Sequence, residues 1–105
     1  DLDYVVGQFE MAGFRGGVNY YRNFHRNWEI TENLEGVGVT VPTLFIAGER
    51  DVVITGRSQE ALHDSMSRVV DDLRGVVLIS EVGHWVQQEA PQETNAAMLE
   101  FLQNL

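Results

Sequence analysis

Two side chains that could work together as an acid–base pair, Asp51 and His84, each follow a short apolar run. The runs are 41–47 (VPTLFIA) and 76–80 (VVLIS), and a brief turn separates each run from its polar residue. A carboxylate that accepts a hydrogen bond from one ring nitrogen of a histidine fixes the tautomer and leaves the other nitrogen free as a base. Histidine changes protonation closer to neutral pH than other side chains do. The pair therefore predicts the kind of base that a hydrolase uses.

Each member of the pair also has a simpler interpretation. His84 stands between Gly83 and Trp85 and could be an ordinary loop residue. Asp51 could belong to a solvated turn, because Asp and Gly favour turns, and Glu49 is a rival for the orienting acid. The pairing itself favours the catalytic interpretation of His84, because ligands of open α/β sheets gather at the carboxyl ends of the strands.

The elements that would hold the pair fit an α/β fold with parallel strands. The nearly continuous apolar residues of 41–47 indicate a strand buried on both faces. The stretch from 41 to 81 has the length and order of a right-handed βαβ crossover, which brings the ends of both strands to one edge of a sheet. Two strands alone make a marginal sheet, so we expect this region to be the end of a larger one.

Two further helices are predicted in the same region. Ser58 is a candidate N-cap for the crossover helix, and Pro91 suits the first turn of the last helix. The predicted inner face of the crossover helix is Leu62, Met66, Val69 and Val70. The predicted buried stripe of the last helix is Met98, Phe101, Leu102 and Leu105.

The first part of the chain is predicted to be helical. One helix is expected over 1–13, ending at Gly13, and a second from about Asn19 to Glu29. The apolar stripe of the first is Leu2, Val5, Val6 and Phe9, and that of the second is Tyr21, Phe24 and Trp28. The polar, glycine-bearing segment 32–40 is predicted to be a linker.

Composition narrows the possible functions. The chain has 105 residues, 44% of them hydrophobic, and no cysteine, which excludes a disulfide scaffold and a cysteine nucleophile. Its formal net charge is −9, so neither a nucleic acid nor a membrane surface is an expected partner. The three histidines lack metal-ligand spacing, and we expect no metal and no cofactor. A cytoplasmic location is predicted from the lack of a signal-peptide pattern.

Three segments resemble epoxide hydrolases of the α/β-hydrolase fold, and together they span almost the whole chain. VPTLFIAGERDVV (41–53) resembles the segment that carries the orienting acid of that family. EVGHWVQQEAP (81–91) resembles the segment with its catalytic histidine. GFRGGVNYYRNFHRNW (13–28) looks like its cap, where the family has a tyrosine just before Arg-Asn, at Tyr21 here. The resemblance places the orienting acid at Asp51.

The resemblance implies a division of the chain and a role for each site residue. Residues 1–31 would be a helical cap segment, 32–40 a linker, and 41–105 the C-terminal part of an α/β-hydrolase core. It also implies that Tyr21 donates a proton to the epoxide oxygen. From spacing alone Tyr21 would be a core aromatic residue, and Trp85 either lines the substrate pocket or packs in the core.

In that family an aspartate on a sharp strand-to-helix elbow attacks the epoxide and forms an alkyl-enzyme ester, which water activated by the histidine hydrolyses to a vicinal diol. No such elbow occurs in this sequence. We therefore expect a fragment that is inactive alone and is completed by the N-terminal part of the same enzyme. A homodimer is a candidate assembly for the complete enzyme. The alternatives are another α/β hydrolase, such as a fluoroacetate-type dehalogenase or a serine esterase, or a non-enzymatic fragment.

Overall fold

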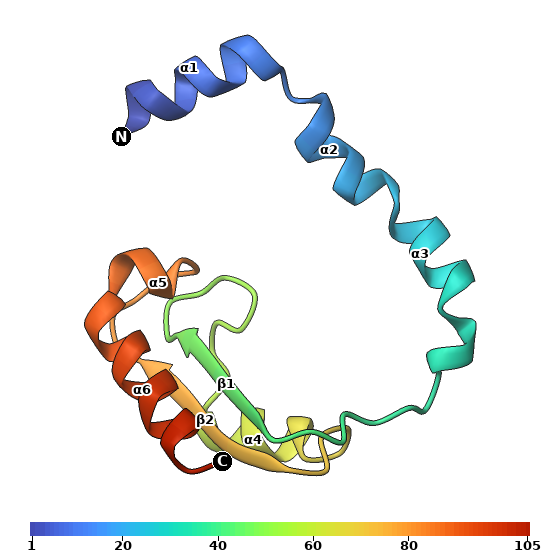
Figure 1. The fold of residues 1–105 in the computed structure, drawn as a ribbon, viewed down its shortest axis with the longest axis vertical. Coiled ribbons are helices and arrows are strands. Elements are labelled where there is room, and N and C mark those ends of the chain that lie inside the picture. The colour runs from blue at the N-terminus through green and yellow to red at the C-terminus, as the bar shows by residue number, and fades with distance from the viewer. The chain divides into compact units, whose positions relative to one another are not determined.

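The computed structural model describes all 105 residues, which form two compact units, Asp1–Gly36 and Val37–Leu105. The first unit is helical (Figure 1). Its elements are α1 (Leu2–Ala12), α2 (Arg15–Arg22), α3 (Phe24–Ile30) and the 3₁₀ turn η1 (Glu32–Leu34). None of these elements contains a buried residue.

Helix α1 ends as the sequence predicts. Gly13 has a φ of 66°, and its N–H donates to the carbonyl of Phe9 at 2.8 Å. Glycine reaches this left-handed region without a steric cost, which is why it commonly ends helices. The expected apolar stripe of α1 is nevertheless exposed, and the ring of Phe9 stacks on that of Phe14 with 4.7 Å between the ring centroids.

The second predicted helix, from Asn19 to Glu29, is wrong in its bounds, because two helices occupy this region and meet at Asn23. The N–H of Asn23 is shared between the carbonyls of Asn19 and Tyr20, each 3.3 Å away. Such shared bonds are typical of helix ends, and asparagine side chains compete with the helical backbone for hydrogen bonds. Tyr21 therefore lies in the last turn of α2.

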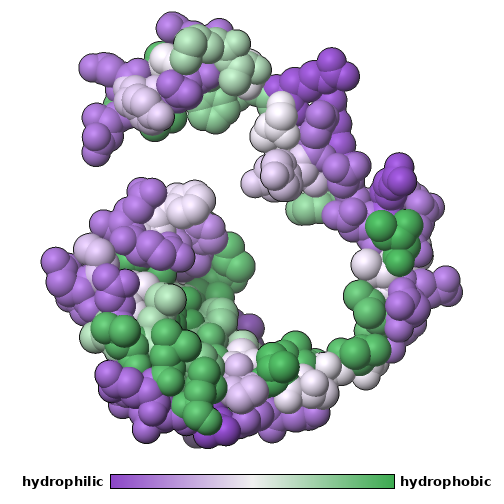
Figure 2. Space-filling model, in the orientation of Figure 1, coloured by the Kyte–Doolittle hydropathy of each residue, from purple (hydrophilic) through white to green (hydrophobic).

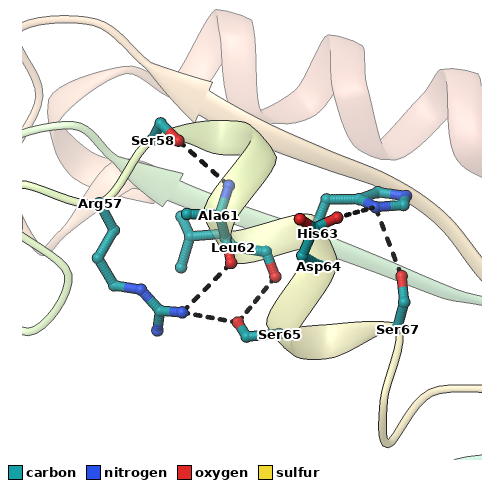
Figure 3. Close-up of polar contacts among 8 residues, drawn as sticks. All are labelled: Arg57, Ser58, Ala61, Leu62, His63, Asp64, Ser65 and Ser67. Atoms are coloured by element: carbon teal, nitrogen blue, oxygen red, sulfur yellow. Dashed lines mark hydrogen bonds and ion pairs between the residues drawn. The ribbon is translucent and has the colours of Figure 1, made fainter.

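The second unit is a two-stranded parallel sheet with helices packed on it, which is the α/β architecture that the sequence predicts. Its elements are β1 (Thr43–Gly48), α4 (Gln59–Met66), β2 (Leu73–Ile79), α5 (Val86–Glu89) and α6 (Pro91–Gln103). The strands pair from Thr43 opposite Leu73 to Gly48 opposite Ile79, with a shift in register between Thr43 and Leu44. Helix α4 connects them, and α4 and α6 lie on opposite faces of the sheet (Figure 1, Figure 3).

Both strands are displaced from their predicted bounds. Strand β1 begins at Thr43, after Pro42, which has no N–H to give to a ladder. Strand β2 begins at Leu73, well before the predicted start at Val76. The polar Arg74 and the small Gly75 conceal this part of the strand in the sequence, and pairing with β1 recruits it.

Helix α4 begins where the sequence predicts. The Ser58 hydroxyl accepts from the N–H of Ala61 at 3.1 Å, and Arg57 donates to the Ser65 hydroxyl at 2.7 Å across the first turns (Figure 3). Leu62 is the buried residue of α4, at 3% exposure. Of the expected inner face, Val70 is also buried and Met66 half-buried, whereas Val69 follows the end of the helix and is exposed.

Helix α6 begins at Pro91 as expected, but most of its apolar stripe is not buried. Phe101 is half-buried, while the other members are exposed: Met98, Leu102 and Leu105. Apolar side chains gather on the surface of the second unit over α6 and the strands (Figure 2). No helix of the structure has both the length and the apolar character needed to cross a bilayer.

Candidate active site

The parallel pairing of β1 and β2 brings Asp51 and His84 together. The strands end side by side, with Gly48 opposite Ile79, and each polar residue lies in the loop that follows its strand. Nδ1 of His84 lies 2.8 Å from Oδ2 of Asp51, a hydrogen-bonding distance. This contact is the one that the sequence predicted from the crossover.

Asp51 is held firmly and is 7% exposed. Its Oδ1 accepts from the backbone N–H of Val53 at 2.9 Å, and its carbonyl accepts from the Thr55 hydroxyl at 2.7 Å. The bond from Val53 and then the bond from His84 hold the pKa of Asp51 below its ordinary value, against the opposing effect of desolvation. Asp51 is thus a carboxylate at neutral pH, and only an N–H at Nδ1 of His84 can satisfy it.

The two loops are joined by further hydrogen bonds. The N–H of Glu49 donates to the carbonyl of Ile79 at 2.9 Å, and that of Arg50 donates to the carbonyl of Val82 at 2.8 Å. The Glu49 carboxylate accepts from the Ser80 hydroxyl at 2.8 Å. Glu49, the rival for the orienting acid, therefore links the two strand ends, while Asp51 contacts the imidazole.

Gly48, at the end of β1, allows this close approach. A Cβ on Gly48 would lie 2.1 Å from the carbonyl oxygen of Gly83 and 2.2 Å from that of Val82. Both are backbone atoms of the turn that leads into His84, so a side chain at this position would displace the turn. The sequence offered a signal here, because a glycine in a strand often marks close approach of another backbone.

Glu89 is another residue that the sequence reasoning missed. Its carboxylate accepts from the N–H of Gly83 at 2.8 Å and from the N–H of Trp85 at 3.0 Å, on either side of His84. An acid shortly after the start of a helix that reaches back to free N–H groups is the principle of the capping box. The spacing from Trp85 to Glu89 was the available signal.

The other two predicted site residues are exposed. The Trp85 ring meets the His84 ring edge to face, with centroids 5.1 Å apart, and Trp85 is 61% exposed. Tyr21 contacts Phe24 in the first unit, with ring centroids 5.5 Å apart. The expected contact of Tyr21 with the acid–histidine pair stays a prediction, as does a pocket lined by Trp85.

Comparison with known proteins identifies relatives along the whole chain. Epoxide hydrolase A of Mycobacterium tuberculosis is 48% identical over 105 residues, which are 100% of this chain and 31% of the relative. The solved structure of potato (Solanum tuberosum) epoxide hydrolase I matches with a TM-score of 0.86 and 40% identity, over 99% of this chain and 33% of that one. Epoxide hydrolase A from Mycobacterium thermoresistibile matches with a TM-score of 0.80 and 46% identity, over 97% and 31%.

No protein-family model matches the chain. The chain spans about a third of the length of the relatives that it matches. The matches extend over the residues of both units, and the solved relatives share the α/β arrangement of strands and helices seen here. The chain is a homologue of the α/β-hydrolase-fold epoxide hydrolases and corresponds to their C-terminal region.

Proposed function

We propose that this chain supplies the acid–histidine pair of an epoxide hydrolase, with His84 as the base that activates water and Asp51 as the acid that orients it. The observation that carries the proposal is the 2.8 Å contact between Nδ1 of His84 and Oδ2 of Asp51. With Nδ1 bonded to a carboxylate, Nε2 carries the lone pair and can accept a proton from water. The matched relatives are named as epoxide hydrolases, which favours this chemistry over that of a dehalogenase or an esterase.

The reaction that we propose has two covalent steps. A carboxylate nucleophile outside these residues attacks a carbon of the epoxide ring, the C–O bond breaks, and the ring oxygen takes a proton from the phenol of Tyr21. Nε2 of His84 then removes a proton from water, and the resulting hydroxide attacks the ester carbonyl. The diol leaves, the nucleophile returns to a carboxylate, and the proton on His84 restores the phenol. Splitting one difficult step into two easier ones is the advantage of covalent catalysis.

The exposed apolar surface of the second unit is evidence that another polypeptide packs against this chain. Leu99 and Leu102 of α6 are 57% and 56% exposed, and each strand of the sheet has only one neighbouring strand. Exposed apolar patches and free strand edges mark interaction surfaces. We propose that the N-terminal part of the same enzyme, with its nucleophile, occupies this surface, that residues 1–31 serve as its cap segment, and that Trp85 lines the pocket. A homodimer of the complete enzyme stays a prediction.

Trapping the ester tests the function directly. The chain would be joined to the N-terminal part of an epoxide hydrolase. The parent would then be compared with His84→Gln and with a control, His63→Gln, which changes a histidine of α4 outside the acid–histidine pair. We expect His84→Gln to accumulate an adduct of enzyme plus epoxide in intact-mass spectra, because ring opening proceeds and ester hydrolysis does not. His63→Gln should turn over like the parent. An adduct-free His84→Gln enzyme that still forms diol would exclude the proposed base.

A further inference from the structure

We propose that Glu89 is a positioning residue for His84, which it holds through the backbone on both sides of the imidazole-bearing residue. This goes beyond the proposed function, and its kinetic consequence rests on that function. The Glu89 carboxylate accepts from the N–H of Gly83 at 2.8 Å and from the N–H of Trp85 at 3.0 Å. One charged group thus binds the Val82–Gly83 and the His84–Trp85 peptide units, one on each side of His84.

The position of His84 needs such support because little packing restrains it. Its side chain is 55% exposed, and Trp85 next to it is also exposed. Asp51 fixes the ring at Nδ1, and the N–H of Arg50 binds the loop at the carbonyl of Val82, but neither bond engages the backbone N–H groups beside His84. Hydrogen bonds to an ionised acceptor are stronger than those between neutral groups. The two bonds to Glu89 therefore fix the backbone, and Asp51 fixes the ring.

Glu89 is itself anchored to the core of the second unit. Its N–H donates to the carbonyl of Trp85 at 2.9 Å, so the two residues are bonded in both directions. Val86 and Ala90, at the two ends of this short helical turn, are each 5% exposed and pack with Ile79 at the end of β2. The carboxylate thereby connects the loop of His84 to the sheet through α5.

Buried Thr94 strengthens the same connection. Its hydroxyl donates to the carbonyl of Val86 at 3.1 Å, which ties α5 to the first turn of α6. Gly83 fits the arrangement as well, because a Cβ there would lie 3.1 Å from each oxygen of the Glu89 carboxylate. The carboxylate occupies the space that a side chain at Gly83 would need.

The role that we propose for Glu89 differs from that of a helix cap, because it extends to the position of the His84 ring. A cap stabilises its own helix, whereas a positioning residue also determines whether Nδ1 of His84 meets Asp51. The N–H proton on Nδ1 gives a direct signal of that contact in proton NMR, and amide exchange at Gly83 and Trp85 reports the two bonds to Glu89. Together the two readouts separate the two roles.

The first test uses this chain as it is, in the forms Glu89→Ala, Glu89→Gln and, as matched control, Glu93→Ala. Glu93 is an exposed acid in the first turn of α6. For Glu89→Ala we expect amide exchange at Gly83 and Trp85 to accelerate about tenfold, and the Nδ1 proton signal of His84 to shift or broaden. The Ile79 amide should be unchanged, which shows that the fold persists. Glu89→Gln keeps one acceptor oxygen, so exchange should accelerate at one of the two amides. This variant tests the proposal if the alanine variant unfolds.

A His84 signal that stays in place while the two amides exchange faster would overturn the proposal, since Glu89 would then be a cap and no more. Unchanged amide exchange would overturn it as well. These outcomes are independent of any reaction, so they stand even if the chain belongs to no epoxide hydrolase.

The second test measures single turnovers in the complete enzyme. Glu89→Ala should slow hydrolysis of the alkyl-enzyme ester about 100-fold, because a base that is misplaced by about 1 Å loses that much. The rate of ester formation should stay within about twofold, since ring opening does not use His84. Equal slowing of both steps would contradict the positioning role. A parent enzyme that forms no ester at all would instead refute the proposed function and leave the NMR result unaffected.

Discussion

Residues 1–36 and 37–105 differ in how much of their own structure they stabilise. The second unit buries seven apolar residues together with Asp51 and Thr94. The helices of the first unit bury none, although they carry large apolar side chains such as Tyr21, Phe24 and Trp28. Most helical stability in proteins comes from packing of an apolar face. The acid–histidine pair is therefore defined by contacts within its own unit, whereas the expected role of Tyr21 depends on what packs around its helix.

The strongest test of that contrast is Tyr21→Phe in the complete enzyme. Loss of a hydrogen-bond donor to a developing alkoxide typically costs about 100- to 1000-fold in turnover. We expect a loss of that size in the rate of ring opening, measured by single-turnover formation of the ester, with ester hydrolysis unchanged. Tyr20→Phe, one residue earlier on α2, is the matched control. Undiminished ring opening by Tyr21→Phe would remove the first unit from the chemistry.

Truncating a buried leucine compares the two units by stability. Leu62 is 3% exposed under the sheet, whereas Leu2 of α1 is 74% exposed. Leu62→Ala should lower the free energy of unfolding of residues 37–105 by about 2–5 kcal/mol, from lost burial and the cavity left behind. Leu2→Ala should change it by less than about 0.5 kcal/mol. Urea titration followed by residue-resolved NMR would measure both, and equal losses would contradict the contrast.

Replacing a glycine by alanine should destabilise the second unit at Gly48 and stabilise a helix of the first unit at Gly17. Gly48→Ala places a Cβ against the backbone of Val82 and Gly83, and crowding of this kind typically costs about 1–3 kcal/mol. Gly17→Ala, within α2, meets nothing within 4 Å and should favour that helix by about 0.5–1 kcal/mol. Circular dichroism at low temperature would follow the helicity, and urea unfolding the stability. A Gly48→Ala protein as stable as the parent would show that the loop of His84 adapts freely.

Low pH should lower the stability of the second unit specifically, because Asp51 lies there. The folded pKa of Asp51 is lower than its ordinary value of 3.8, so the stability that it contributes is fully present above that value. That stability is lost as pH falls through the lowered pKa, when the carboxyl group is protonated in the folded state as well. We expect the free energy of unfolding of 37–105 to decrease below about pH 4, and the decrease to be smaller in Asp51→Asn. Identical acid titrations of parent and variant would contradict this.

The sequence predicted those features that depend on local chemistry. Ser58 begins α4, Pro91 begins α6 and Gly13 ends α1, because capping and backbone preferences act over a few residues. The contact of Asp51 with His84 was predictable because parallel strands end at one edge of a sheet. Their catalytic roles, and that of Tyr21, stay predictions.

Features that depend on other parts of the fold were not predictable in this way. An apolar stripe such as the one that ends at Leu105 shows which side of a helix avoids water, but not whether anything covers that side. The break at Asn23 lies within a stripe that continues into α3, so periodicity alone joined two helices. Glu89 acts on backbone N–H groups, and such contacts leave no mark on a hydrophobic pattern. A glycine at the end of a strand signals that another backbone approaches closely, but the fold decides that this backbone is the turn at Gly83.

The pairing of β1 with only β2 has a practical consequence for work with this chain alone. Each strand presents its outer row of N–H and C=O groups to the surroundings, and exposed apolar side chains such as Met98 and Leu102 of α6 lie beside β1. Strand edges of this kind are templates for pairing with further copies, the first stage of amyloid-like aggregation. Purified preparations should therefore be kept dilute, and light scattering against protein concentration should rise more steeply than for a protein whose sheet edges are covered.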